Sequence, residues 1–167
     1  MAARLSAKAD KGEIIYIKNT KIMKTLNQHS NKIFCAMLEK MDGKQYLKME
    51  SEGFMPLIIE RIGEQIITPF GYANHYSLCH YYKQMGDMMK DPEMCFIVVD
   101  QRLDDVQNYE KIKIIPSMYQ QDNVGLFEES VTIIENITKN YAPKLNADHV
   151  AFANLWLANI QRQGFLN

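Results

Sequence analysis

The chain has 167 residues, of which 47% are hydrophobic and 23% are charged, and its formal net charge is −1. A chain of this length buries roughly two thirds of the surface that its unfolded form exposes, so one domain can fold without a disulfide or a structural metal. The small net charge argues against a protein that is basic throughout, and binding to nucleic acid would therefore need a local basic patch.

Charge is unevenly spread along the chain. Residues 1–50 hold ten Lys or Arg against five Asp or Glu, whereas residues 87–130 hold four against ten. This pattern fits a solvated basic helix at one end and acidic loops at the other. It also fits a surface that steers a charged partner.

The cysteines and the first residues favour a reducing cytoplasm. Cys35, Cys79 and Cys95 are an odd number with no close pairing, and the chain opens without a basic segment followed by a long apolar one. We therefore expect neither a signal peptide nor a membrane anchor, and the apolar runs are too short to cross a bilayer. Residues 1–167 are expected to form a single domain in which residues 1–12 are loosely held.

The first regular element expected is an amphipathic helix of roughly five turns. Asn19 or Thr20 is its candidate N-cap, and Asp42-Gly43 is its candidate end. The apolar positions that recur at helical spacing are Ile22, Leu26, Ile33, Met37 and Met41.

After Gly43 the sequence consists of short apolar runs separated by turn residues, a pattern that predicts strands. The runs are residues 45–49, 56–62, 64–68, 75–82, 94–100, 111–119 and 124–133. No helical pattern separates them, so hairpins and an antiparallel meander are expected, with a tight turn at Gly63. Pro116 cannot donate a ladder hydrogen bond and marks its strand as an edge or a bulge.

The final segment returns to helical spacing. Asn146 is the expected N-cap, and Gly164 is expected to end the helix. Its apolar face consists of Val150, Phe152, Leu155, Trp156 and Ile160. The chain is therefore predicted to be an α+β domain, with an antiparallel meander sheet of about five to seven strands and with an N-terminal and a C-terminal amphipathic helix covering one face.

Residues 80–94 carry a family resemblance. The motif reads His80-Tyr81-Tyr82, then Gly86-Asp87, then Asp91-Pro92-Glu93-Met94, and it is joined by residues 119–122 and 156–165. These blocks resemble an uncharacterised bacterial domain family that is carried on conjugative elements, plasmids and phages. The resemblance covers about residues 54–165. It implies an intracellular accessory protein of a mobile element, with no catalytic residue or cofactor to transfer.

The same segment is the first candidate binding surface. We expect its carboxylates to sit in a rigid, proline-stiffened acidic turn, with residues 119–125 as a second polar connection that is closed by glycine. The leading hypothesis is a non-enzymatic module that binds a protein partner there, because an acidic surface repels nucleic-acid phosphates. The expected binding residues are His80, Tyr82, Asp87, Asp91, Glu93, Gln120, Gln121 and Asp122. Turn geometry and packing alone also account for these residue types.

A second hypothesis is a divalent-metal-dependent hydrolase of the nuclease kind. Carboxylate oxygens are ligands that Mg²⁺ prefers, and a histidine can act as the base. The candidate catalytic residues are His80, Asp87, Asp91 and Glu93. This hypothesis requires the four side chains to converge in a cleft.

A third hypothesis places nucleic acid against the basic N-terminal helix, through Lys21, Lys24 and Lys32. The sequence contains no P-loop, GxGxxG, HExxH or GxSxG motif. A zinc site is not expected either, because His75, Cys79, His80 and Cys95 lack the paired ligand spacing of structural zinc sites. We therefore expect no metal and no cofactor.

Overall fold

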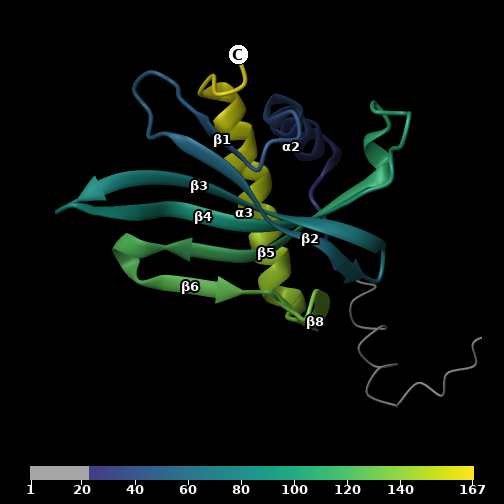
Figure 1. Cartoon of the computed structure of the whole chain (residues 1–167). Helices are drawn as coiled ribbons and strands as arrows, with labels where there is room; N and C mark the ends of the chain where they lie inside the picture. The colour runs from purple at the N-terminus through teal and green to yellow at the C-terminus, as the bar shows by residue number, and fades with distance from the viewer. Residues whose placement is uncertain (1–22) are drawn as a thin grey trace, which may run out of the picture.

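A sheet of eight strands forms the centre of the computed structural model, which describes residues 23–167 (Figure 1). The strands are β1 Tyr46–Met49, β2 Leu57–Thr68, β3 Gly71–Gln84, β4 Asp87–Asp100, β5 Ile112–Gln121, β6 Leu126–Glu129, β7 Val131–Ile134 and β8 Ile137–Tyr141. Their order in space is β6-β5-β4-β3-β2-β8-β7, and β1 pairs with β2 beside this path. The predicted α+β class is confirmed. Within the described residues one pairing, β2 with β8, is parallel, so the sheet is not a pure meander.

Two helices, α2 Gln28–Met41 and α3 Pro143–Arg162, cover one face of the sheet, which we call the helix face (Figure 1). The ring of Phe34 on α2 lies 5.0 Å from that of Phe96 and 6.1 Å from that of Tyr76, measured between centroids. Trp156 and Leu157 of α3 belong to the same buried core. Burial of apolar area holds both helices on the sheet. Neither of them is long and apolar enough to span a membrane.

The opposite face, which we call the open face, is only partly covered. Strands β7 and β8 fold back over it, so that Val131 packs with Ile97 and Ile115 in a second buried cluster. Ser130, just before β7, donates its N–H to the Ser117 carbonyl of β5 at 2.8 Å. The sheet therefore curls until β7, at one end of the strand order, meets β5 near the other end.

Helix α2 begins later than expected. Its N-cap is Asn27, whose Oδ1 accepts the N–H of Ser30 at 2.8 Å. Met23 and Leu26 lie in the non-helical segment before it, where the Leu26 N–H is donated to the Ile114 carbonyl at 2.9 Å. Both apolar side chains are buried. The helical spacing that predicts an earlier start rests on Leu26 and on Ile22, which lies outside the described residues.

The expected caps at Asn19 and Thr20 lie outside the described residues, as do residues 1–12. The expected end of α2 is confirmed. Asp42 is the C-cap with a φ of 49°, and Gly43 follows with a φ of 73°. A left-handed pair of this kind satisfies the last helical carbonyls.

The expected turn at Gly63 is wrong, since β2 runs through this position without a break. The pairing of β2 with β3 shifts register on both sides of Gly63, which marks a bulged strand. A Cβ at this position would lie 3.2 Å from the Cβ of His75. The glycine therefore permits a close approach of two strands rather than a reversal of the chain.

The expected acidic turn is also wrong. β4 begins at Asp87, directly after a two-residue turn of Met85 and Gly86 that both have positive φ, as hairpin turns of type I′ require. Asp91 and Pro92 together face one residue of β3 at a register shift. Pro92 thus occupies a bulge, where no ladder hydrogen bond is needed, and the carboxylates lie within a strand.

Residues 124–133 form parts of three elements instead of one strand. A 3₁₀ turn, Asp122–Val124, precedes β6, and Ser130 separates β6 from β7. Strand β8 has no counterpart among the expected strands because its sequence, ITKNY, is mostly polar. The bulge expected at Pro116 is confirmed by a register shift between β4 and β5.

Helix α3 begins three residues before its expected N-cap. Pro143 occupies the first turn, where its missing N–H costs no hydrogen bond. Asn146 is buried inside the helix, where its amide donates to the Pro116 carbonyl and its oxygen accepts the Lys24 N–H at 2.9 Å. Gly164 ends the helix with a φ of 84°, as expected.

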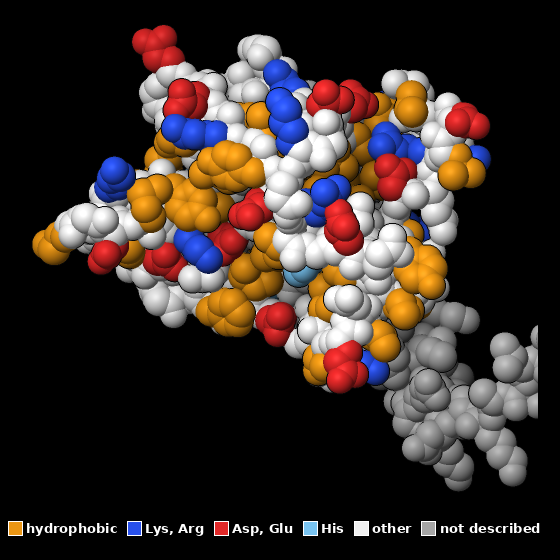
Figure 2. Space-filling view, viewed as in Figure 1, with side chains coloured by type: hydrophobic (Ala, Val, Ile, Leu, Met, Phe, Trp, Pro, Cys, Tyr) orange, Lys and Arg blue, Asp and Glu red, His pale blue; other side chains and the backbone are white. Residues whose placement is uncertain are grey.

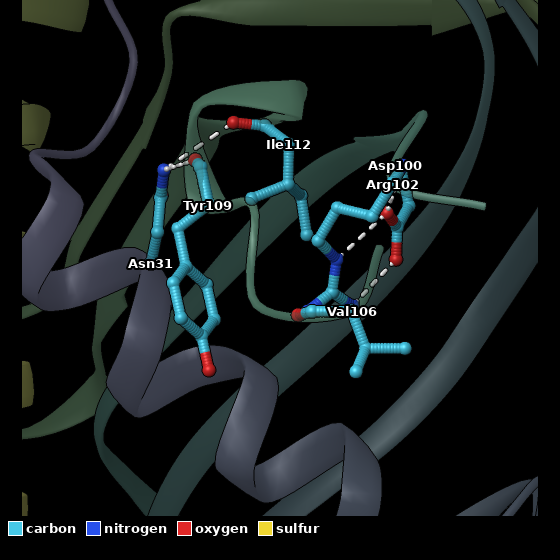
Figure 3. Close-up of polar contacts among 6 residues, drawn as sticks. All are labelled: Asn31, Asp100, Arg102, Val106, Tyr109 and Ile112. Atoms are coloured by element: carbon cyan, nitrogen blue, oxygen red, sulfur yellow. Dashed lines mark hydrogen bonds and ion pairs between the residues drawn. The ribbon is translucent and has the colours of Figure 1, made fainter. Parts of the chain in front are cut away.

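The loop between β4 and β5 is fixed to the body by polar contacts (Figure 3). Arg102 folds back onto the carboxylate of Asp100, with N···O distances of 2.7 and 2.9 Å. From α2, the Asn31 amide donates to two carbonyls near the start of β5, those of Tyr109 and Ile112. The first turn of α2 is therefore tied to the end of this loop.

Replacing Asn27 with alanine should lower the free energy of unfolding by about 1 kcal/mol, because alanine cannot accept the Ser30 N–H. Asn27→Ser keeps a capping oxygen and is the matched control, which should stay close to the wild type. Urea denaturation measures both variants. An equal loss of stability in the two would show that the side chain acts by something other than capping.

Candidate binding site

Two of the expected residues, Gln120 and Asp122, meet Lys90 near the start of β4 and the end of β5. Asp122 accepts the backbone N–H of Lys90 at 2.8 Å and the side-chain amide of Gln120 at 2.7 Å. The Lys90 N–H is the main cause that lowers the pKa of Asp122. This carboxylate is engaged within the protein, and it pins the 3₁₀ turn after β5 to β4.

Glu93 is an enclosed carboxylate on the open face. It is only 7% exposed, accepts the Ser77 hydroxyl at 2.6 Å, and forms an ion pair with Lys90 at 2.5 Å. Desolvating an unpaired charge is costly, so a buried carboxylate needs such partners. The contacts of Glu93 connect β3 to two positions of β4.

Asp91 lies on the other side of the sheet from Glu93. It accepts the side-chain amide of Gln121 at 2.9 Å, and the amide oxygen of Gln121 accepts the Tyr119 hydroxyl at 2.8 Å. The Tyr119 ring packs edge-on against Phe152 of α3, with centroids 5.1 Å apart. Asp91 and Gln121 therefore belong to the helix face.

His80 also lies on the helix face. Its ring centroid is 5.7 Å from that of Trp156 and 5.4 Å from that of Phe165, and its Nδ1 is 3.1 Å from the Met55 carbonyl. Burial lowers the pKa of His80. The neutral ring can donate its Nδ1–H to that carbonyl, so its surroundings are those of a packed core histidine.

The four residues of the hydrolase hypothesis do not converge. His80 and Ser77 are three positions apart on β3, so their side chains leave opposite faces, and Glu93 points with Ser77. Asp87 is exposed where β4 begins. Within residues 23–167, no three His, Cys, Asp or Glu side chains are placed to hold a metal ion.

Two cysteines lie buried on the open face. Burial raises the pKa of Cys79 and that of Cys95 to about 12. Thiols of such low acidity stay protonated at neutral pH, and the thiolate is the nucleophilic form. The two side chains therefore act as small hydrophobes.

Tyr82 lines a surface pocket at the base of the β3–β4 hairpin, which we call the hairpin pocket. Its volume is about 380 Å³, and its apolar and aromatic lining consists of Met55, Pro56, Ile58, Tyr81, Tyr82 and Met88. Beyond it the hairpin projects from the body (Figure 1), and Met85 at its turn is fully exposed. Hydrophobic side chains gather along this projection, at the left of Figure 2.

A second pocket of about 360 Å³ lies on the open face beside β7, and we call it the sheet pocket. His75 and Ser117 line it, with His75 Nε2 3.1 Å from Ser117 Oγ. Burial lowers the pKa of His75 to about 4, so the ring is neutral at physiological pH. The sequence suggests His75 only as a possible zinc ligand. Its contact with Ser117 cannot be predicted from the sequence, because the two residues are 42 positions apart.

Of the three lysines in the nucleic-acid hypothesis, Lys21 lies outside the described residues. Lys24 and Lys32 are exposed. The Lys32 Nζ lies 5.5 Å from the ring centroid of Tyr109, a cation–π contact within the protein. The nucleic-acid hypothesis stays a prediction.

Comparison of the sequence with models of known protein families finds a match. The model of a family described as a domain of unknown function, DUF6908, matches residues 30–166. The chain belongs to this family. The DUF6908 match includes nearly all of α2, so this helix is part of the family domain, although the resemblance found from the sequence began later. No curated protein and no solved structure matches the chain.

The free energy of unfolding of this DUF6908 domain should fall as the pH is lowered from about 6.5 to 4. In the unfolded chain His75 takes up a proton near its ordinary pKa of 6.5, whereas in the folded protein its pKa is lowered to about 4 and it stays neutral above that pH. The stability contributed by neutral His75 is therefore present above pH 6.5, and about 3 kcal/mol of it is lost by pH 4. His80 and His149 act in the same direction, because burial lowers the pKa of each.

Urea denaturation at a series of pH values measures this dependence. His75→Gln should reduce the slope, because the variant has no proton to take up at this position. His29→Gln changes an exposed histidine of α2 and is the matched control. A slope that is the same in His75→Gln and in the wild type would contradict the assignment.

Proposed function

We propose that the domain is a non-catalytic module that binds a protein partner at the projecting end of the β3–β4 hairpin. The observation that carries this proposal is the hairpin pocket, beside a strand edge that no other strand of residues 23–167 pairs with. Exposed apolar surface next to a free edge is the combination that interfaces formed by strand addition use.

The free edge belongs to β3, which continues beyond its neighbour β2. The last pairing between these strands joins Leu57 to His80, and the Tyr81 N–H then reaches the Pro56 carbonyl at 3.4 Å. Residues 82–84 pair with β4 alone among the described strands. An extended partner segment can add to this edge and direct alternate side chains into the hairpin pocket.

The lining of the pocket favours an apolar partner segment that also carries carboxylates. Its charged lining residues are Lys48 and Lys83. Lys48 pairs with Glu50 at 2.5 Å, but both side chains are largely exposed, and such a pair contributes little to stability. The ammonium groups of Lys48 and Lys83 are therefore accessible to a carboxylate of the partner.

The polar residues expected from the sequence support this surface rather than form it. Asp91, Glu93 and Asp122 are each hydrogen-bonded to another side chain or to the backbone at the base of the hairpin. These contacts restrict the hairpin before a partner arrives. A preorganised edge loses less conformational freedom on binding, which favours affinity.

The biological setting of the proposal rests on the resemblance of residues 80–94 to domains of conjugative elements and phages. It supports an accessory role on a mobile element. Three free cysteines are consistent with a reducing cytoplasm as the compartment.

Selection of peptides from a random library against the full chain tests the proposed function. The selected peptides should combine apolar residues with Asp or Glu. Met88→Glu places a negative charge in the hairpin pocket, and Lys83→Glu reverses the charge beside it. Each variant should weaken the binding of the selected peptides by about tenfold or more, a difference of about 1.4 kcal/mol.

Ile134→Glu is the matched control, because Ile134 on β7 is 50% exposed and Met88 is 53% exposed. It should leave peptide binding unchanged, and circular dichroism should show that all three variants are folded. Selected peptides that are basic, or that bind Met88→Glu as tightly as the wild type, would argue against the hairpin as the binding surface.

A further inference from the structure

The sheet pocket is separate from the hairpin pocket, and the two share no lining residue. It lies between the bulged part of β2 and strands β6 and β7. Its volume of about 360 Å³ falls within the range of about 300 to 1,000 Å³ that is usual for small-molecule sites. Ile66, Met118 and Val131 supply apolar walls that a ligand body can contact.

The polar base of this pocket is uncharged. Ser117 is 1% exposed, and its hydroxyl lies 3.2 Å from the Cys95 carbonyl, to which it can donate. The hydroxyl oxygen of Ser117 also lies 3.1 Å from His75 Nε2. Because burial lowers the pKa of His75 to about 4, the pair presents hydrogen-bonding groups without a positive charge at neutral pH.

The rim of the pocket carries an aromatic ring and a carboxylate, both from β6. Glu129 pairs with Met118 and Phe127 pairs with Gln120 across the antiparallel ladder. Because all four side chains share the open face, Phe127 and Glu129 line the pocket together. Phe127 is 62% exposed. Among the lining residues, all of them in the described part of the chain, Glu129 is the one with a formal charge.

From this arrangement we infer that the sheet pocket binds a small organic amine, whose apolar or aromatic body fills the cavity while its ammonium group meets Glu129 and the ring of Phe127. A carboxylate accepts charge-assisted hydrogen bonds from an ammonium group, and an aromatic ring face attracts the same cation. An anionic ligand would meet the Glu129 carboxylate with no cation lining the pocket to compensate it. This inference does not depend on the proposed protein partner.

Calorimetric titration of the full chain with three probes of similar shape tests the inference. The probes are 2-phenylethylamine, 2-phenylethanol and 3-phenylpropanoate, which differ in the charge of the head group. The amine should bind at least about tenfold more tightly than the alcohol or the carboxylate. In amide NMR spectra the amine should shift the signals of Gly63, His75 and Ser117, which line or support the pocket.

Glu129→Gln keeps the shape of the side chain, removes its charge, and should abolish the preference for the amine over the alcohol. Glu135→Gln changes an exposed carboxylate in the turn after β7 and should keep that preference. Equal affinity for the three probes, tighter binding of the carboxylate probe, or no binding of the amine at millimolar concentration overturns the inference. So does a set of shifted signals centred on the hairpin pocket.

Discussion

The hydrogen bonds of Ser130 hold the sheet in its curled form. Its N–H is donated to the Ser117 carbonyl, its carbonyl accepts the Ala142 N–H at 2.8 Å, and its Oγ lies 3.0 Å from Nδ1 of His149. One residue between β6 and β7 thus joins β5, the end of β8 and α3. A buried polar group that loses its hydrogen-bond partner costs about 1 to 3 kcal/mol, so a sheet without these contacts of Ser130 would be less stable. It places β7 over the open face, where β7 completes the second core and one wall of the sheet pocket.

Coverage of the sheet decides where ligands can reach it. Both helices bury the helix face, and β7 and β8 bury part of the other. Along β3 the open side carries His75, Ser77, Cys79 and Tyr81 in alternation, from the sheet pocket to the hairpin pocket. At about 3.3 Å per residue the two pockets are roughly 20 Å apart. One small ligand cannot occupy both, and the buried contacts of Ser77 with Glu93 lie between them.

Local sequence patterns predict those parts of this domain that depend on nearby residues. Helical spacing finds α2 and α3, and alternation finds most strands, because each pattern is set by one buried face. The acidic turn is mispredicted because glycine, proline and carboxylates favour turns, whereas the reversal needs just Met85 and Gly86. The sheet pocket escapes sequence reasoning for a different reason. His75 on β3 and Ser117 on β5 meet across β4, beside the register shift between Cys95 and Phe96, and no local pattern encodes this long-range register.

The segment before α2 crosses between the two cores of the molecule. Met23 is buried in the cluster on the open face, whereas Leu26, three residues later, is buried in the core beneath the helices. A short stretch of chain therefore couples two hydrophobic clusters that the sheet otherwise separates. These residues precede the part matched by the family model, which begins at residue 30. Because Met23 and Leu26 are three residues apart in the chain, a displacement of this segment would disturb the packing on both faces of the sheet together.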